Sequence, residues 1–456
     1  MPLIRKVRKS RHRVLGALSL LLIVSPCLSA ETPWRLSEAF TLPEGLVLNG
    51  SQRTRFENIN ENVRPGTSIN DQVLVFRTIL NAEYQREQFS AQVELMDSRQ
   101  ELATRDSILG TGVVNALDVL QAALKYTLGD RNQTQIKLGR FTADWGSRRL
   151  IARNRFRNTL NAFDGVEVYQ QTPGGNEYRF MASRPVRRLP GDRASLLDND
   201  READESSRAL SLYGAHATLP GLLESLTTEV YLYSLHEQDT REIATRNRRL
   251  NTLGFRLFST PTPGALDFEL ESVFQAGEQR SNSANINILD EDHRAHFQYA
   301  MLGYTFDRPS RLRLQFELDY ASGDDSPFDN NSERFDSLFG VTTFEFAPGG
   351  LYGAFSRSNL ISPGIRITGN ASDRVNLMLS YRHFWLAEKR DSWGGTGLRD
   401  ASGDSDSYLG QHLETRLRWD IVPGNVRIEG GLVLLHAQNL SNNDSTFFYG
   451  GATFTF

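Results

Sequence analysis

Strict alternation of apolar and polar residues, in segments of about ten residues, limits most strongly what this chain can fold into. It is clearest at residues 311–320, RLRLQFELDY. Successive side chains of a strand point to opposite faces. One face is apolar, with Leu312, Leu314, Phe316, Leu318 and Tyr320, and the other is polar, with Arg311, Arg313, Gln315, Glu317 and Asp319. The same split recurs at residues 73–84, 413–420 and 425–434.

The connections between such strands decide between a soluble sheet and a membrane barrel. Short turns fall at residues 86–88, 129–131, 172–175, 259–264, 307–310, 370–373 and 422–424. Long polar loops lie between them, such as residues 184–208, 279–294 and 323–363. A secreted sandwich has no reason to keep this rhythm, whereas an outer-membrane barrel requires it. We therefore predict an all-β fold: one transmembrane antiparallel barrel of about eighteen strands with short periplasmic turns and long extracellular loops.

The two ends of the chain agree with export to the outer membrane. Residues 1–30 combine a basic start with an apolar core at 15–25, as a secretory signal peptide does. We assign residues 31–45 to a periplasmic lead and residues 46–456 to the barrel. The last strand ends in FYGGATFTF, an aromatic pattern that resembles the signal read by the barrel-assembly machinery.

Several classes of function are excluded or disfavoured by what the chain lacks. After the leader no apolar run reaches the roughly twenty residues of a membrane-spanning helix. The only cysteine of the chain, Cys27, lies in the leader, which excludes disulfides and thiolate metal sites. The histidines lack metal-ligand spacing, and no phosphate-binding loop is present, so we expect no metal, no cofactor and no nucleotide-driven transport.

An arginine-rich segment, residues 139–165, is the candidate site. Six arginines, Arg140, Arg148, Arg149, Arg153, Arg155 and Arg157, accompany only two acids, Asp144 and Asp164. Removal of the leader takes away six basic and no acidic residues, so the formal charge falls from −4 to −10 and the cluster contrasts with an acidic chain. Guanidiniums crowded in this way favour a place where anions can pair with them.

The alternation of short turns and long loops places this segment in the third long loop, from about residue 142 to 162. Folded into the lumen, the loop would form a constriction whose arginines bind carboxylates, with Asp164 orienting them. Strand parity through Ile136 and Leu138 places Arg140 toward lipid, so we predict a bulge at Gly139 that turns it inward.

The barrel wall is expected to select weakly because its lumen charges balance. Alternation places Arg77, Arg313, Arg416 and Arg418 inward, opposed by Glu57, Glu94, Glu167, Glu269, Glu271, Glu317, Asp319 and Glu414. Four further lumen arginines join the candidate contacts: Arg53, Arg55, Arg366 and Arg382.

The segment GRFTADWGSRRLIARNRFRNTLNAFDGVEV, residues 139–168, resembles the central signature of the outer-membrane alginate-export family. The resemblance rests on Gly139, Arg140, Gly146, Arg149, Leu150, Asn158 and residues 163–166. Later landmarks follow in the same order at 320–325, 335–340, 358–360, 381–393 and 408–414. The resemblance implies an eighteen-stranded barrel whose arginine-lined constriction passes a polyuronate out of the cell. Phe141 and Phe156 depart from the pattern, where the family has Gln and Trp.

These observations predict a passive channel of the bacterial outer membrane that exports an anionic polysaccharide such as alginate. Uptake of small carboxylates is the alternative, and a solvated loop that touches lipopolysaccharide phosphates is the plainest interpretation of the arginines. A barrel enzyme would need a pair such as Asp292 with His293 and His296, and we predict none. Expected partners are outer-membrane lipid and lipopolysaccharide, the barrel-assembly machinery and periplasmic export proteins, but not nucleic acid.

Overall fold

The computed structural model describes residues 32–129, 134–241, 243–284, 289–326 and 329–456. The chain divides into two units, Met1–Pro33 and Trp34–Phe456, and only Thr32 and Pro33 of the first are described. The predicted signal peptide, residues 1–30, lies outside the described residues. Across the described ranges, no helix has the length and apolar character that crossing a membrane requires.

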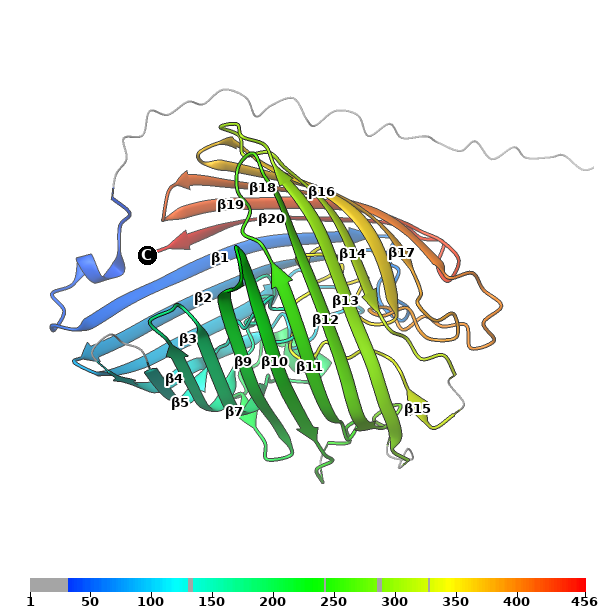
Figure 1. The fold of residues 1–456 in the computed structure, drawn as a ribbon, viewed down its shortest axis with the longest axis horizontal. Helices are drawn as coiled ribbons and strands as arrows, with labels where there is room; N and C mark the ends of the chain where they lie inside the picture. The colour runs from blue at the N-terminus through cyan, green and yellow to red at the C-terminus, as the bar shows by residue number, and fades with distance from the viewer. Residues whose placement is uncertain (1–31, 130–133, 242, 285–288, 327–328) are drawn as a thin grey trace, which may run out of the picture. The chain divides into compact units, whose positions relative to one another are not determined.

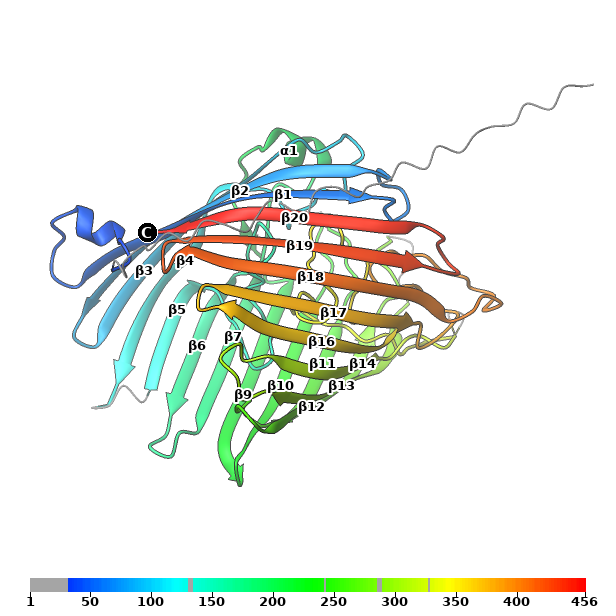
Figure 2. The ribbon, with the colours of Figure 1, turned by 90° about the horizontal axis from the view of Figure 1, so that it is seen from above.

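Within the described residues of the second unit, eighteen long strands form one antiparallel sheet that closes on itself (Figures 1 and 2). Each pairs with the next long strand, and β20 pairs with β1 from Thr455 opposite Ser51 to Thr446 opposite Asn60. Closure leaves no open edge for lipid to meet. The predicted all-β barrel is confirmed.

The wall strands follow one another around the barrel in the order of the sequence. They are β1 Leu46–Asn60, β2 Asp71–Arg86, β3 Phe89–Glu101, β4 Asn115–Leu128, β5 Thr134–Phe141, β6 Phe163–Gln171, β7 Glu177–Arg187, β9 Leu210–Leu223, β10 Leu226–Glu237, β11 Arg249–Phe258, β12 Leu266–Gln279, β13 Glu291–Thr305, β14 Arg313–Ala321, β16 Leu360–Ser372, β17 Val375–Trp385, β18 Tyr408–Val422, β19 Val426–Ala437 and β20 Asp444–Thr455. The short elements are η1 Leu36–Ala39, α1 Arg193–Asp198, β8 Glu205–Ser206 and β15 Asn331–Ser332.

The two faces of the wall follow the predicted alternation. On β14, Phe316 and Leu318 are about half exposed on the outside, at 51% and 44%, whereas Glu317 and Asp319 are buried inside. The outer face is therefore apolar and suits hydrocarbon. The inner face is polar, and its side chains are covered because two loops enter the lumen.

The connections are short at one end of the barrel and long at the other. Turns of two and three residues follow β2, β16 and β18. The third loop, residues 142–162, joins β5 to β6 with the predicted bounds. The expected loops 279–294 and 323–363 were too long, since β13 begins at Glu291 and β16 at Leu360. At both places the strand extends into the segment whose polar composition had suggested a loop, because its residues still alternate between buried and exposed.

The third loop and the described part of the seventh loop, residues 322–326 and 329–359 between β14 and β16, fold into the barrel and pair with each other. Ile151 forms a parallel bridge with Phe339, and the Phe339 amide donates to the Leu150 carbonyl oxygen at 2.9 Å. Apolar residues of both loops pack against inward residues of the wall, including Trp145 in one cluster and Phe355 in the other. The lumen is therefore constricted by two loops, of which the sequence analysis identified one.

Residues that precede the first strand are fastened at the short-turn end. The ring of Trp34 stacks on Phe454 with centroids 6.0 Å apart. The Trp34 amide donates to Asn425 Oδ1 at 2.9 Å, and Asn425 Nδ2 donates to the Trp34 carbonyl oxygen at 2.8 Å. The assignment of residues 31–45 to a periplasmic lead remains a prediction.

Candidate functional site

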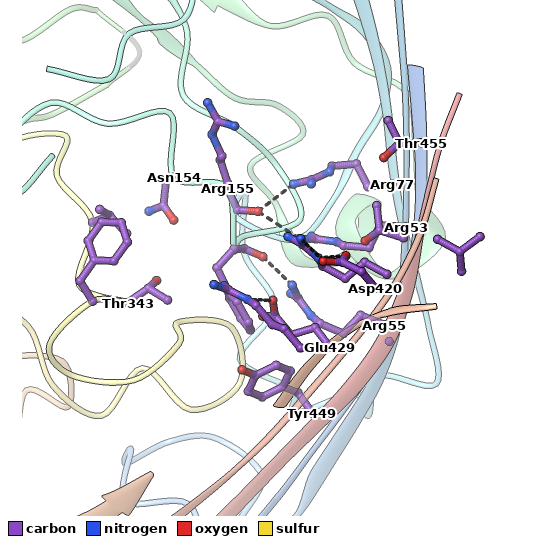
Figure 3. A pocket seen from close by; sticks show the side chains of 18 of the residues that line it. Arg53, Arg55, Arg77, Asn154, Arg155, Thr343, Asp420, Glu429, Tyr449 and Thr455 are labelled. Atoms are coloured by element: carbon purple, nitrogen blue, oxygen red, sulfur yellow. Dashed lines mark hydrogen bonds and ion pairs between the residues drawn. The ribbon is translucent and has the colours of Figure 1, made fainter. Parts of the chain in front are cut away.

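A cavity of about 720 Å³ lies inside the barrel, bounded by the third loop, the seventh loop and the wall (Figure 3). It extends to the turn between β18 and β19, so it reaches the short-turn end. Seven arginines line it: Arg53, Arg55, Arg77, Arg148, Arg155, Arg418 and Arg427. Its acids are Asp144, Asp420 and Glu429. Positive charge is therefore in excess here.

Two wall arginines hold the third loop by its backbone. Arg53 Nη1 and Nη2 donate to the carbonyl oxygens of Arg155 at 3.0 Å and Arg157 at 2.9 Å. Arg77 Nη1 donates to the same two oxygens at 3.1 and 2.9 Å. Figure 3 shows both side chains extended from the wall toward Arg155. Because a carbonyl oxygen carries no full charge, these bonds position the loop and leave the guanidinium charges unneutralised.

Arg55 holds the next part of the loop but is neutralised. Its Nε and Nη2 bond to Glu57 Oε1 at 2.9 and 2.5 Å, and its Nη1 donates to the Phe156 carbonyl oxygen at 2.6 Å. The guanidinium also lies 3.9 Å from the centre of the Phe156 ring. The aromatic residue at position 156 thus joins the loop to the wall.

Arg148 and Arg155 face the cavity from the third loop. The Arg148 guanidinium stacks over Phe344 of the seventh loop at 4.3 Å. The Arg155 side chain is 72% exposed and lies 3.3 Å from Asp144. Among the described residues, no carboxylate comes within ion-pair distance of Arg53, Arg77 or Arg148. These three guanidiniums, with the loosely paired Arg155, can bind an anion that enters the cavity.

Arg149 and Arg153 anchor the third loop. Arg149 is buried and pairs with Glu271 at 2.5 Å, Glu269 at 2.6 Å and Glu345 at 3.0 Å. Burial lowers the pKa of Arg149, but these three carboxylates outweigh it and hold that pKa well above its ordinary value. Arg153 Nη2 pairs with Glu94 at 2.8 Å. Both arginines are occupied by carboxylates of the protein itself.

Arg140 lies elsewhere, and the predicted bulge at Gly139 is wrong. The pairing of β5 with β4 and β6 runs through Gly139 without a shift of register. Lys137 pairs with buried Glu167 inside the barrel, so Arg140 falls on the same side as exposed Leu138. There it bonds to Asp164 at 2.8 and 3.1 Å. Asp164 therefore orients Arg140, while Asp144 holds the loop by accepting from the Arg153 amide at 2.8 Å.

The remaining sequence candidates lie away from this cavity. Arg382 is fully buried and pairs with Glu317 at 2.5 Å and with Asp319. Arg366 also pairs with Glu317, at 3.3 Å. The side chain of Arg157 lines a different cavity, on the loop side of the third loop.

Comparison with known proteins identifies the family. The family model described as alginate export matches residues 46–435, most of the chain. The chain belongs to the alginate-export family. Comparison with curated proteins gave no match.

Solved structures with a similar fold include a BenF-like porin and two proteins of Pseudomonas aeruginosa. The BenF-like porin from Pseudomonas fluorescens Pf-5 has a TM-score of 0.61 at 13% identity, with 91% of this chain and 99% of that chain covered. Pseudomonas aeruginosa OccK9 (OpdG) has a TM-score of 0.60 at 12% identity, covering 91% and 98%. Pseudomonas aeruginosa OpdO has a TM-score of 0.57 at 13% identity, covering 91% and 97%. At these identities the likeness concerns the fold.

This member of the alginate-export family is therefore a porin-like channel of the bacterial outer membrane and not an enzyme. The resemblance to the alginate-export family, noted from residues 139–168, is confirmed. The residues weighed for a barrel enzyme do not converge: His293 is buried inside, whereas Asp292 is exposed and His296 stacks on Tyr320.

Two parts of the cavity were not predicted from the sequence. Arg77 was recognised as a lumen residue but not as a candidate contact. Phe344 was missed because the seventh loop was expected outside the barrel. A signal was available, since residues 341–355, VTTFEFAPGGLYGAF, are too apolar and aromatic for a solvated loop.

Proposed function

We propose that this channel exports an anionic polysaccharide such as alginate, and that Arg53, Arg77, Arg148 and Arg155 bind its carboxylates. One observation carries the proposal: these guanidiniums line one cavity and lack a close carboxylate partner among the described residues, apart from Asp144 at 3.3 Å from Arg155. Arginine binds carboxylates through paired N–H groups, which favours uronates over small inorganic anions.

The charge balance of the wall supports the same assignment. Arg382 and Arg366 are neutralised by Glu317 and Asp319 together, and Arg418 by Glu429 at 2.5 Å. The unpaired positive charge is concentrated where the third loop meets β1 and β2. A polymer that enters from the short-turn end is therefore held first at this stretch.

The position of the cavity favours export. It extends to the turn between β18 and β19, the end at which a polymer from the periplasm arrives. Binding has to be weak enough for release. Asp144 weakens the binding of the substrate because it competes with the substrate for Arg155. Solvent weakens it further, because it screens the charge of the exposed Arg155 side chain.

A second candidate is uptake of small carboxylates, favoured by the limited volume of about 720 Å³ that the two loops leave. It would use the same four arginines. The length of the preferred solute distinguishes the two proposals.

The test is block of the wild-type channel in planar lipid bilayers by uronate oligomers of increasing length, added at the short-turn side at low salt. The export proposal expects affinity to rise about tenfold or more from monomer to tetramer, since several guanidiniums then act on one chain. Neutral oligosaccharides of equal length are the control and should not block. Equal affinity for monomer and oligomers would favour uptake, and absence of block by any uronate would reject both.

A further inference from the structure

A second cavity, of about 520 Å³, lies on the loop side of the third loop. Its walls come from the third and seventh loops, from the loop between β7 and β9, and from the loop between β10 and β11. Arg157 and Arg188 line it together with Asn161. Arg188 belongs to none of the sequence candidates and is contributed by the loop after β7.

Two guanidiniums meet at one amide oxygen in this cavity. Arg188 Nη1 donates to Asn161 Oδ1 at 2.6 Å, and Arg157 Nη2 donates to the same oxygen. Arg188 Nε donates to the Thr111 carbonyl oxygen at 2.9 Å. Arg157 Nε is buried and has no hydrogen-bond partner in the described part of the chain. The pair therefore retains donors that no group of the protein uses.

In the part of the chain that the structure describes, the two arginines of this pair have no ion-pair partner, although burial lowers the pKa of Arg188 and Asp204, from a longer distance, offsets part of this effect. Across the described residues, no carboxylate lies at ion-pair distance from Arg157 or Arg188. Glu237, which lines the cavity, pairs with Arg248 at 2.8 Å, and Arg187 has its own partner, Glu205, at 3.4 Å. Burial and the nearby Arg188 lower the pKa of Arg157 to about 9. Like charges held this close are stabilised by an anion between them.

We infer that Arg157, Arg188 and Asn161 form a second carboxylate-binding site, on the extracellular side of the constriction. The inference rests on the proposed function, because the carboxylate is that of the exported polyuronate. Arg157 connects the two sites: its carbonyl oxygen accepts from Arg53 and Arg77, whereas its side chain lines the second cavity. A polymer that leaves Arg155 of the first set thus meets Arg157 two residues further along the loop.

The site predicts block from the loop side. Uronate tetramer added at that side of a wild-type channel should block the current, and Arg188→Gln should weaken this block about tenfold, the effect of losing one charge-assisted contact. Block by the same tetramer added at the short-turn side should persist. Arg187→Gln is the matched control, because it lines the same cavity but pairs with Glu205.

The outcomes separate the inference from the function on which it rests. A wild-type channel that no uronate blocks from either side would reject the proposed function. Loop-side block that is equal in wild type and Arg188→Gln would overturn the second site and leave the first intact. Arg157→Gln provides the same test should Arg188→Gln fail to insert, and unchanged conductance at high salt shows that either variant has folded.

Discussion

Arg149 of the third loop and Glu345 of the seventh loop form a buried ion pair, with Nη2 and Oε1 3.0 Å apart. Glu345 also accepts from Arg357 Nη2 at 2.6 Å. Arg149 in turn reaches Glu269 and Glu271 of β12. The pair therefore joins both loops to each other and to the wall, next to Arg148 and Phe344, which line the first cavity.

Close approach of the two loops can be tested without changing charge. A side chain at Gly340 would place Cβ 1.8 Å from the Arg149 carbonyl oxygen, so Gly340→Ala should push the loops apart. We expect larger and noisier single-channel conductance in planar bilayers. Gly349→Ala, in the same loop, meets nothing within 4 Å and should behave as wild type. Wild-type conductance in Gly340→Ala would contradict the packing of the seventh loop on the third.

Removal of Arg149 leaves buried carboxylates without their cation. Arg149→Ala should lower the free energy of unfolding by about 3–5 kcal/mol, as breaking a buried ion pair does. Urea unfolding in lipid vesicles, followed by tryptophan fluorescence, measures it. Arg179→Ala, whose partner Glu177 is 3.5 Å away and partly exposed, should cost about 0–1 kcal/mol. Equal effects of the two substitutions would show that Arg149 does not anchor the loop.

The junction between the loops should resist mild acid. Burial raises the pKa of Glu345, but Arg149 and Arg357 outweigh it and hold that pKa below the ordinary value of 4.5. A carboxyl group with a lowered folded-state pKa stabilises the fold fully above 4.5 and loses this contribution as the pH falls through its folded pKa. The stabilisation of the junction by Glu345 should therefore be constant from pH 7 to pH 5 and be lost only below about pH 4.5, so the difference in gating noise between wild type and Glu345→Gln should begin to shrink only there. A difference between wild type and Glu345→Gln that already shrinks near neutral pH would contradict this assignment.

Most of the wall was predictable because the membrane imposes a simple rule. Residues such as Phe316 must face hydrocarbon and residues such as Glu317 must face the lumen, so the period of two is explicit in the sequence. Closure of β20 on β1 follows from the same requirement. The third loop could also be predicted as a candidate site, because its arginines have few acids nearby in the sequence.

The roles of individual arginines were not predictable from the sequence. Arg148 and Arg149 are adjacent, yet one faces the cavity and the other is enclosed by Glu269, Glu271 and Glu345, which are 120 or more positions away. Arg140 was misplaced because the expected bulge is absent. Such differences depend on which distant carboxylates the fold brings near each guanidinium, and local spacing carries no information on that.

The central claim is that guanidiniums facing the first cavity bind carboxylates, and the double variant Arg148→Gln with Arg155→Gln tests it most directly. The measurement is the reversal potential in a salt gradient, together with block by a uronate tetramer from the short-turn side. Loss of two charge-assisted contacts should weaken the block about a hundredfold and reduce anion selectivity. Thr343→Ala, which lines the same cavity without charge, should retain both. Unchanged selectivity and block in the double variant would contradict the claim.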